Sequence, residues 1–528
     1  MRIPSRYLLA ILVCGFSFVG AAAQCPPRPQ PNTVVLDAPS LYSQNGVLNA
    51  DFTMAHSVDL NGYTHYCYKY EAATGVVEAP TLRVNPGDRL LLNVKDRIVS
   101  NGPESKDAMD MSPSGSTCGD GGTATINSTN VHFHGMNVPP TCHQDDVLTT
   151  LIQPAAPGFQ FDMQIPTNEP PGLYWYHPHV HGFTEFQVNG GAAGAIVVEG
   201  MEKVRPEVTG LTERVFTIRQ EYLVPWVPGP YQLTLNFQNA ASVQGPTPMI
   251  EMKPGEKQFW RVLNATLQDF MPLQVWFNSV PQPMQLIALD GYPLAAPRNE
   301  TTILVPPAGR AEFIVQAPPA GVSANFMTLA YSTGPTGNAD LEQPLAAMVL
   351  SNSPHNPPAL PAKASAPTST ASIKMDSLKF AGLKNATPTA QRHIYFSEEF
   401  GGTNGPIQFY ITVDGQKQKV FEANEKPAIT TKVGAVEDWT IENHALETHD
   451  FHIHQIHFMM LEVNGKAVAD QDLRDTFEIP YWSGSGPYPS IKVRMDFRDP
   501  TTAGTFVFHC HILLHEDLGM MHKIQVLP

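Results

Sequence analysis

Short stretches in which hydrophobic and polar residues alternate dominate this chain. Examples are QFWRVLNAT, residues 258–266, and DWTIENHA, residues 438–445, both rich in β-branched and aromatic side chains. Long runs with the 3.6-residue period of an amphipathic helix are few, and 49 prolines and 39 glycines interrupt the pattern. The pattern therefore predicts an all-β protein built from sandwiches or barrels.

Internal repeats divide the chain into similar units. Three turn-and-strand stretches place a glycine and an acidic residue before a strand: VNPGDRLLLNV (84–94), MKPGEKQFWRV (252–262) and TKVGAVEDWTI (431–441). A stronger correspondence joins GLYWYHPH (172–179) to GTFVFHCH (504–511), which share the register of their aromatic residues and histidines. We therefore expect three related β domains, of which the first and third carry histidine pairs and the second does not.

The expected domains span residues 24–200, 201–352 and 373–528, with a linker rich in proline, serine and alanine at residues 353–372. Residues 1–23 have the layout of a secretory signal peptide, because Arg2 and Arg6 precede an apolar run and Ala21–Ala23 follow it. No later stretch approaches the about 18 apolar residues of a membrane span. These features predict a secreted or periplasmic protein without a membrane span.

The charge and the cysteines agree with an exported protein. The formal net charge of −16 becomes −18 once Arg2 and Arg6 are removed with the signal, which argues against nucleic acid as a partner. A monomer is expected. Four cysteines remain outside the signal and the C-terminal histidine motif, and they fit two disulfides in any of three connectivities: Cys25, Cys67, Cys118 and Cys142. Cys510 is then left as a free thiol.

Histidines recur in His-x-His pairs, and the chain has five of them. Because side chains alternate faces along a strand, His509 and His511 point one way and Cys510 points the other. In HDFHIHQIH, His452 and His454 share a face. His449 lies three residues before His452 and therefore faces the opposite side, where it can join Cys510. One strand pair can thus serve two metal sites.

The ligand set of a blue-copper site consists of a thiolate, two imidazoles and a weak axial methionine. Cys510, His449, His515 and Met520 supply that set in this chain. Zinc is the rival metal, but structural zinc sites favour paired cysteines. Eight further histidines, four from the first domain and four from the third, suit a cluster of three copper ions between these domains: His132, His134, His177, His179, His452, His454, His509 and His511.

Four motifs resemble the copper-binding signatures of the three-domain multicopper oxidases, the group that contains laccases, cuprous oxidases and bilirubin oxidases. They are HFHG from His132, WYHPH from Trp175, HDFHIH from His449 and HCHILLHEDLGMM from His509. The resemblance implies three cupredoxin-like domains that bind four copper ions and couple oxidation of a reductant to the four-electron reduction of dioxygen to water. One departure is Asp450, where the family usually has proline.

The same resemblance implies how the eight histidines are divided among the copper ions. It assigns His132 and His452 to the type 2 copper, and it divides the type 3 pair between two trios: His134, His177 and His511, and His179, His454 and His509. Electrons are expected to pass from the type 1 copper through Cys510 to its neighbours in the sequence. Glu516 and Asp145 resemble the family's acids near the cluster, and we expect them to deliver protons.

The distribution of methionines bears on the reductant. Cuprous oxidases typically carry a methionine-rich insertion, since thioethers suit Cu(I), whereas the 19 methionines here are scattered. Phenol oxidation of the laccase kind is therefore the first expectation, and oxidation of a metal ion, Cu(I) or Fe(II), is the alternative. A non-enzymatic copper carrier would need only the Cys510 site. Copper nitrite reductase uses two such domains and lacks the four histidine pairs.

Overall fold

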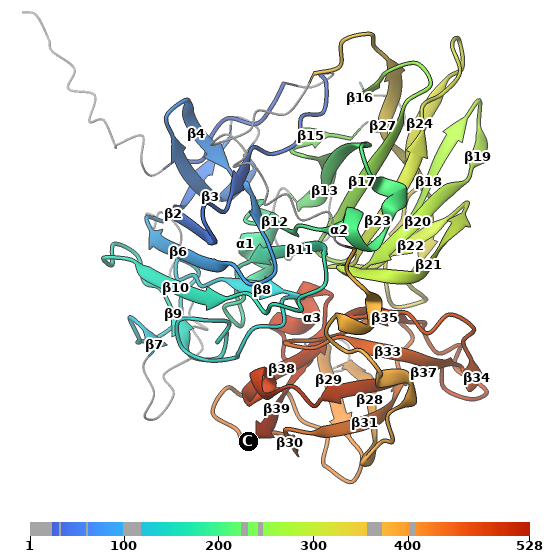
Figure 1. Cartoon of the computed structure of the whole chain (residues 1–528). Helices are drawn as coiled ribbons and strands as arrows, with labels where there is room; N and C mark the ends of the chain where they lie inside the picture. The colour runs from blue at the N-terminus through green and yellow to red at the C-terminus, as the bar shows by residue number, and fades with distance from the viewer. Residues whose placement is uncertain are drawn as a thin grey trace, which may run out of the picture.

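The computed structural model describes residues 24–30, 33–59, 62–98, 118–222, 231–240, 247–355, 372–400 and 407–528. The expected signal peptide, residues 1–23, and most of the expected linker lie outside these ranges. The structure is mostly β and contains three cupredoxin-like units, as predicted (Figure 1). The exact domain limits stay a prediction. None of the helices in the described part of the chain is long and apolar enough to cross a bilayer.

The first unit, blue to cyan in Figure 1, is a sandwich of two five-stranded sheets. One sheet has the order β1 (Ser40–Tyr42), β5 (Thr81–Val84), β12 (Gly194–Val198), β11 (Gly172–His177) and β8 (His132–His134). The other has the order β10 (Phe159–Gln164), β6 (Arg89–Asp96), β2 (Val47–Val58), β3 (Thr64–Ala72) and β4 (Gly75–Glu78). Alternating burial along β2 and β6 places the apolar face of this second sheet on a shared core.

Two disulfides cross-link segments of the first unit. Cys25 is bonded to Cys67 on β3, and Cys118 on the short strand β7 (Cys118–Gly119) is bonded to Cys142. β7 pairs with β9 (Thr150–Leu151). The two disulfides are one of the three connectivities that the sequence allowed. Cys510 is free and buried, as expected.

The second unit, green to yellow in Figure 1, follows the short helix α2 (Met201–Val204). Its larger sheet has the order β15 (Gln238–Asn239), β14 (Tyr231–Leu235), β13 (Thr212–Tyr222), β17 (Lys257–Ala265), β23 (Arg310–Gln316), β20 (Met284–Leu289) and β21 (Tyr292–Glu300). The facing sheet has the order β16 (Met249–Met252), β27 (Gln343–Leu350), β24 (Ala324–Thr328), β18 (Met271–Phe277) and β19 (Val280–Gln282), with β22 (Ile303–Val305) also paired to β18. A small hairpin joins β25 (Tyr331–Ser332) to β26 (Ala339–Asp340).

The third unit, orange to red in Figure 1, carries the C-terminal motif. Its larger sheet has the order β29 (Ile407–Val413), β28 (Ala390–Phe400), β31 (Ala435–Asn443), β37 (Ser490–Phe497), β33 (Phe458–Val463) and β34 (Lys466–Ala467), and β35 (Leu473–Arg474) also pairs with β33. Its other sheet has the order β30 (Ile429–Lys432), β39 (Met521–Leu527), β38 (Gly504–Cys510), β32 (His449–Ile453) and β36 (Thr476–Ile479).

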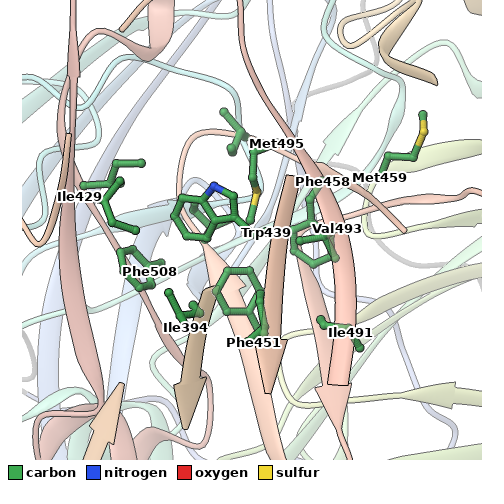
Figure 2. Packing of buried hydrophobic residues seen from close by; sticks show 14 of the residues in the cluster. Ile394, Ile429, Trp439, Phe451, Phe458, Met459, Ile491, Val493, Met495 and Phe508 are labelled. Carbon is green, nitrogen blue, oxygen red and sulfur yellow. The ribbon is translucent and has the colours of Figure 1, made fainter. Parts of the chain in front are cut away.

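A dense aromatic core holds the two sheets of the third unit together (Figure 2). The ring of Trp439 meets the ring of Phe508 edge to face at 5.4 Å, and the indole N–H donates a hydrogen bond to Glu437 at 2.9 Å. Phe451 lies between the histidines of β32 and has no exposed surface. Burying each such side chain contributes about 1.5–3 kcal/mol. This core therefore packs against the strands that carry the candidate metal ligands and keeps them rigid.

Two short helices join the first and third units. Asp517, in α3 (Leu513–Asp517), accepts hydrogen bonds from the backbone N–H groups of Gly182, Thr184 and Glu185 at the start of α1 (Thr184–Asn189), at 2.8–3.1 Å. These N–H groups have no partner within their own helix, so a carboxylate from the other domain satisfies them. The contact fixes α3 against the first unit, next to its histidine pairs.

Candidate metal centres

Cys510, His449 and His515 form one compact donor set. The Sγ atom of Cys510 lies 3.6 Å from Nδ1 of His449 and 3.8 Å from Nδ1 of His515, and the two nitrogens are 3.3 Å apart. The centre of such a triangle is about 2 Å from each atom, which is a usual metal–nitrogen or metal–sulfur distance. The three side chains can therefore bind one ion in a trigonal arrangement, the geometry of a blue-copper site.

The local backbone explains how these residues meet. On the paired strands β32 and β38, Phe451 is opposite Cys510, and His449 lies two residues before Phe451. α3 then carries His515 back over the cysteine, and the backbone N–H of Cys510 donates to the carbonyl of Met520 at 3.1 Å. Met520 is fully buried in the same hydrophobic cluster as Cys510. Burial raises the pKa of the Cys510 thiol well above its ordinary value, so a thiolate here needs a cation beside it.

Two carboxylates face the outer edges of these imidazoles, and the sequence patterns did not reveal them. Glu398 Oε1 lies 3.3 Å from Nε2 of His449, and Glu447 Oε2 lies 3.6 Å from Nε2 of His515. Their side chains are only 3 % and 10 % exposed. Burial raises the pKa of Glu447 to about 9, and repulsion from Glu398 is the second-largest cause of this shift.

The eight other candidate histidines gather between the first and third units. On β8 and β11 His132 is directly opposite His177, and on β32 and β38 His452 is directly opposite His509. Each strand pair therefore presents neighbouring imidazoles on one face. Rings from the two units stack on one another, His132 on His454 at 3.8 Å and His134 on His452 at 3.9 Å.

The donor atoms are close enough to share metal ions. His179, His454 and His509 come together as one trio, with Nε2 of His509 lying 3.3 Å from Nε2 of His179 and 3.2 Å from Nε2 of His454. Two other groupings overlap at His132: His132, His134 and His177, and His132, His452 and His454. Ring centroids of His134, His177 and His511 are 5.0–5.7 Å apart. The division of the eight histidines between metals stays a prediction.

Hydrogen bonds set which ring nitrogen is free. Nδ1 of His132 lies 3.0 Å from both oxygens of Asp145, Nδ1 of His177 lies 2.9 Å from the Pro178 carbonyl, and Nδ1 of His452 lies 2.8 Å from the Asp475 carbonyl. Nε2 of each of these three rings has no hydrogen-bond partner among the described residues. Burial lowers the pKa of all eight imidazoles, so they are neutral. A neutral imidazole with a free nitrogen and an anchored one is the usual metal ligand.

The two candidate proton donors contact different histidines of this cluster, Asp145 through His132 and Glu516 through His509 and His179. Asp145 also accepts hydrogen bonds from the backbone N–H of Phe133 at 2.9 Å and from Gln455 at 2.5 Å. Burial raises its pKa to about 7. Glu516 lies 3.3 Å from Nδ1 of His509 and 3.5 Å from Nε2 of His179, and burial raises its pKa well above the ordinary value.

Asp450, the departure from the family pattern, is also buried. One carboxylate oxygen accepts a hydrogen bond from Thr476 at 2.9 Å, and burial raises the pKa of this group well above its ordinary value. Its backbone carbonyl accepts from the N–H of His511 at 2.8 Å. The backbone of Asp450 thus joins the two strands that carry both donor sets.

Comparison with known proteins identifies the same regions. Residues 124–203, 212–355 and 401–528 match three family models that are each described as multicopper oxidase, and together these ranges cover more than half of the chain. The multicopper oxidase mco of Staphylococcus haemolyticus is 24% identical over 498 residues, which is 89% of this chain and 90% of that protein.

Solved structures show the same fold. A multicopper oxidase from Campylobacter jejuni, described as a metallo-oxidase, superposes with a TM-score of 0.66 at 23% identity, covering 95% of this chain and 96% of that one. The laccase-like multicopper oxidase CueO of Ochrobactrum sp., described as acting on lignin model compounds and lignosulfonate, gives a TM-score of 0.61 at 20% identity, covering 95% of this chain and 100% of that one.

Proposed function

Because this chain belongs to the multicopper oxidase family, we propose that it oxidises a reductant one electron at a time at a type 1 copper and reduces dioxygen to water at a trinuclear centre. Cys510, His449, His515 and Met520 would hold the type 1 copper. The eight-histidine cluster forms the trinuclear centre, with type 2 and type 3 ligands divided as the family resemblance implies. Bound copper would supply the one-electron couple, and four ions together match the four electrons that dioxygen accepts.

The observation that carries this proposal is that one strand end serves both donor sets. Cys510 contributes its sulfur to one set, His509 belongs to the other, and the ring of His511 lies beside those of His134 and His452 in the same cluster. A hydrogen bond of 3.0 Å between Nδ1 of His509 and the carbonyl of Cys510 gives a second connection. Electrons that enter at the cysteine thus have a short covalent route to the cluster, while the reductant stays away from dioxygen.

Reduction of dioxygen to water also consumes four protons. We assign their delivery to Glu516 and Asp145, which contact histidines of the cluster directly and have no exposed carboxylate surface. A carboxylic acid held within hydrogen-bond reach of the reacting centre is a competent general acid. The two groups approach from different units, Asp145 from the first and Glu516 from the third.

For the reductant, the acidic pair Glu398 and Glu447 favours a metal cation, and ferrous iron in particular. The carboxylates reach the outer nitrogens of both type 1 histidines, and Glu398 Oε1 has no hydrogen-bond partner among the described residues. A divalent cation between them would relieve their repulsion and lie one imidazole away from the type 1 copper. Carboxylates are hard ligands that suit Fe(II) better than Cu(I), which prefers sulfur.

Phenol oxidation of the laccase kind is the second candidate. One of the two carboxylates could accept the hydrogen bond of a phenolic O–H beside the histidine edge. The Ochrobactrum structure is described as acting on lignin models and the Campylobacter structure as a metallo-oxidase, so similar folds are associated with both kinds of reductant.

Oxygen uptake by the copper-loaded protein tests the proposal. Fe(II), Cu(I) and a methoxyphenol are supplied at matched concentrations, and the electrons consumed per dioxygen are counted. Four electrons per dioxygen with Fe(II) oxidised fastest supports the proposal. A phenol far ahead of both metals moves the function to a laccase, and no uptake with any reductant overturns the oxidase assignment.

We also propose that the protein works outside the cytosol, in the periplasm or the extracellular medium. The two disulfides support this location, because such bonds persist in oxidising compartments. Fractionation of the native host, with the blue protein followed in each fraction, tests it. Recovery in the cytosol with both cysteine pairs reduced would overturn it.

A further inference from the structure

A single arginine of the second unit contacts all three units of the protein. Arg310 begins β23 and has no exposed surface. Its Nε donates to the carbonyl of Leu173 in the first unit at 3.2 Å, and Nη1 and Nη2 donate to Asp475 in the third unit at 2.7 and 2.5 Å. The two remaining N–H groups donate to the carbonyls of Ala308 and Asp290 at 3.1 and 2.8 Å. All five donors of the guanidinium are therefore used.

The partner of this arginine lies against the histidine cluster. Arg310 binds both carboxylate oxygens of Asp475. This bidentate arrangement fixes the orientation of the carboxylate in addition to pairing its charge. The backbone carbonyl of Asp475 lies 2.8 Å from Nδ1 of His452, and its Oδ1 lies 3.5 Å from Nε2 of His134. A movement of Asp475 would thus change the tautomer or the tilt of two rings that come from different units.

The residue after His134 leaves room for this pair. Gly135 has a φ of +82°, and a Cβ atom there would lie 2.5 Å from Nη2 of Arg310 and 2.6 Å from Oδ2 of Asp475. Only glycine combines this backbone conformation with such a close approach. The glycine of the HFHG motif therefore lets an ion pair from the other two units reach the back of the histidines.

We propose that Arg310 is a positioning residue for the trinuclear centre. It holds Asp475 so that His452 and His134 present the correct nitrogen to the metals, and this gives the second unit, which carries none of the assigned copper ligands, a direct part in the centre. The proposal rests on the proposed function, because it requires that the histidine cluster binds copper.

The test compares Arg310→Lys with Arg261→Lys in the copper-loaded protein. Lysine keeps the positive charge at position 310 but loses the planar fork that bonds both oxygens of Asp475. Arg261 is a matched control, since it is a buried arginine of the same unit that pairs with Glu312 and Glu213 and has no contact with the cluster. Copper per chain, the type 1 and type 2 signals in electron paramagnetic resonance, and thermal unfolding of the metal-free protein are measured.

We expect Arg310→Lys to keep the blue type 1 signal but to change the type 2 signal, and to lose the type 2 copper to a chelator about 10- to 100-fold more readily than the unsubstituted protein. Arg261→Lys is expected to lower thermal stability with both copper signals intact. Equal copper retention and an unchanged type 2 signal in Arg310→Lys would overturn the inference.

If Arg310→Lys does not fold, Asp475→Asn decides, because it breaks the same bidentate pair from the third unit. An altered type 2 signal with type 1 intact supports the inference, and an unaltered one refutes it. Failure of the proposed function is distinguishable, since in that case the unsubstituted protein itself binds no type 2 copper.

Discussion

The carboxylate of Glu516 lies 3.3 Å from the imidazole of His509. The residue before Glu516 is His515, whose Nδ1 faces Cys510. One turn of α3 therefore reaches both donor sets, because His515 belongs to one set and Glu516 contacts a histidine of the other. The helix in turn is fixed to the first unit through Asp517. This arrangement separates the two kinds of site by only a few residues while keeping both rigid.

Glu516→Gln is expected to slow reoxidation of the fully reduced protein by dioxygen on the order of 100-fold, because the amide cannot donate a proton to the cluster. The blue absorption and the rate at which the reductant bleaches it are expected to be unchanged, since Glu516 does not contact Cys510. Stopped-flow mixing of reduced protein with dioxygen measures the first, and anaerobic mixing with reductant measures the second. Unchanged reoxidation would remove Glu516 from proton delivery.

Asp145→Asn is expected to act differently. Asp145 accepts from the ring of His132, the backbone of Phe133 and Gln455, so the amide would disturb the position of His132 as well as the proton supply. We expect the type 2 copper to be lost to a chelator about 10- to 100-fold more readily. Copper analysis alongside the reoxidation rate measures both effects, and full retention of copper with a normal rate would contradict both roles.

Cys510→Ser is expected to abolish the blue absorption, because that colour requires a thiolate bound to copper. Met520→Leu is the contrasting change, since it removes only the weak axial ligand. It is expected to keep the colour and to raise the type 1 potential. A blue Cys510→Ser protein would refute the assignment of this cysteine, and a colourless Met520→Leu protein would refute the weak axial role of the methionine.

The acidic pair gives a prediction about the reductant. Glu398→Gln and Glu447→Gln are each expected to raise the KM for Fe(II) at least about 10-fold, since each removes a charge-assisted contact worth about 1.5–3 kcal/mol. The kcat for a methoxyphenol is expected to change much less. Glu462→Gln, a partly exposed carboxylate of the same unit, is the control. Equal effects on iron and phenol would count against a metal-ion site.

The alternation of side chains along the strands predicted much of the candidate site. Alternation alone placed His449 with Cys510 and kept His509 and His511 on the other face, and the structure brings those groups together. Glu398 was not predictable in this way, because it reaches His449 from β28, in the other sheet of the third unit. Arg310 and Asp475 meet across a domain interface, which no local pattern describes. The disulfide partners likewise depend on which strands become neighbours, so the sequence left three connectivities open.

The pH dependence of stability offers a prediction far from the metal sites. Asp96, at the end of β6, is fully buried. One carboxylate oxygen accepts a hydrogen bond from the N–H of Ile98 at 2.8 Å, and the other has no hydrogen-bond partner among the described residues. Burial raises its pKa to about 8. In the unfolded chain the pKa is about 3.9, so between these values the folded state holds a proton that the unfolded state has lost. The contribution of this group to stability therefore decreases as the pH rises.

We expect metal-free Asp96→Asn to become more stable relative to the unsubstituted metal-free protein as the pH rises from about 5 to about 8. The difference between their unfolding free energies is expected to grow by at most about 1.4 kcal/mol per pH unit. The amide does not titrate and so lacks the slope that the carboxyl imposes. Denaturant unfolding at several pH values measures the difference between the two proteins. Asp414→Asn, at an exposed position, is the control and is expected to run parallel to the unsubstituted protein. A parallel course for Asp96→Asn would mean that Asp96 ionises without cost in the folded state.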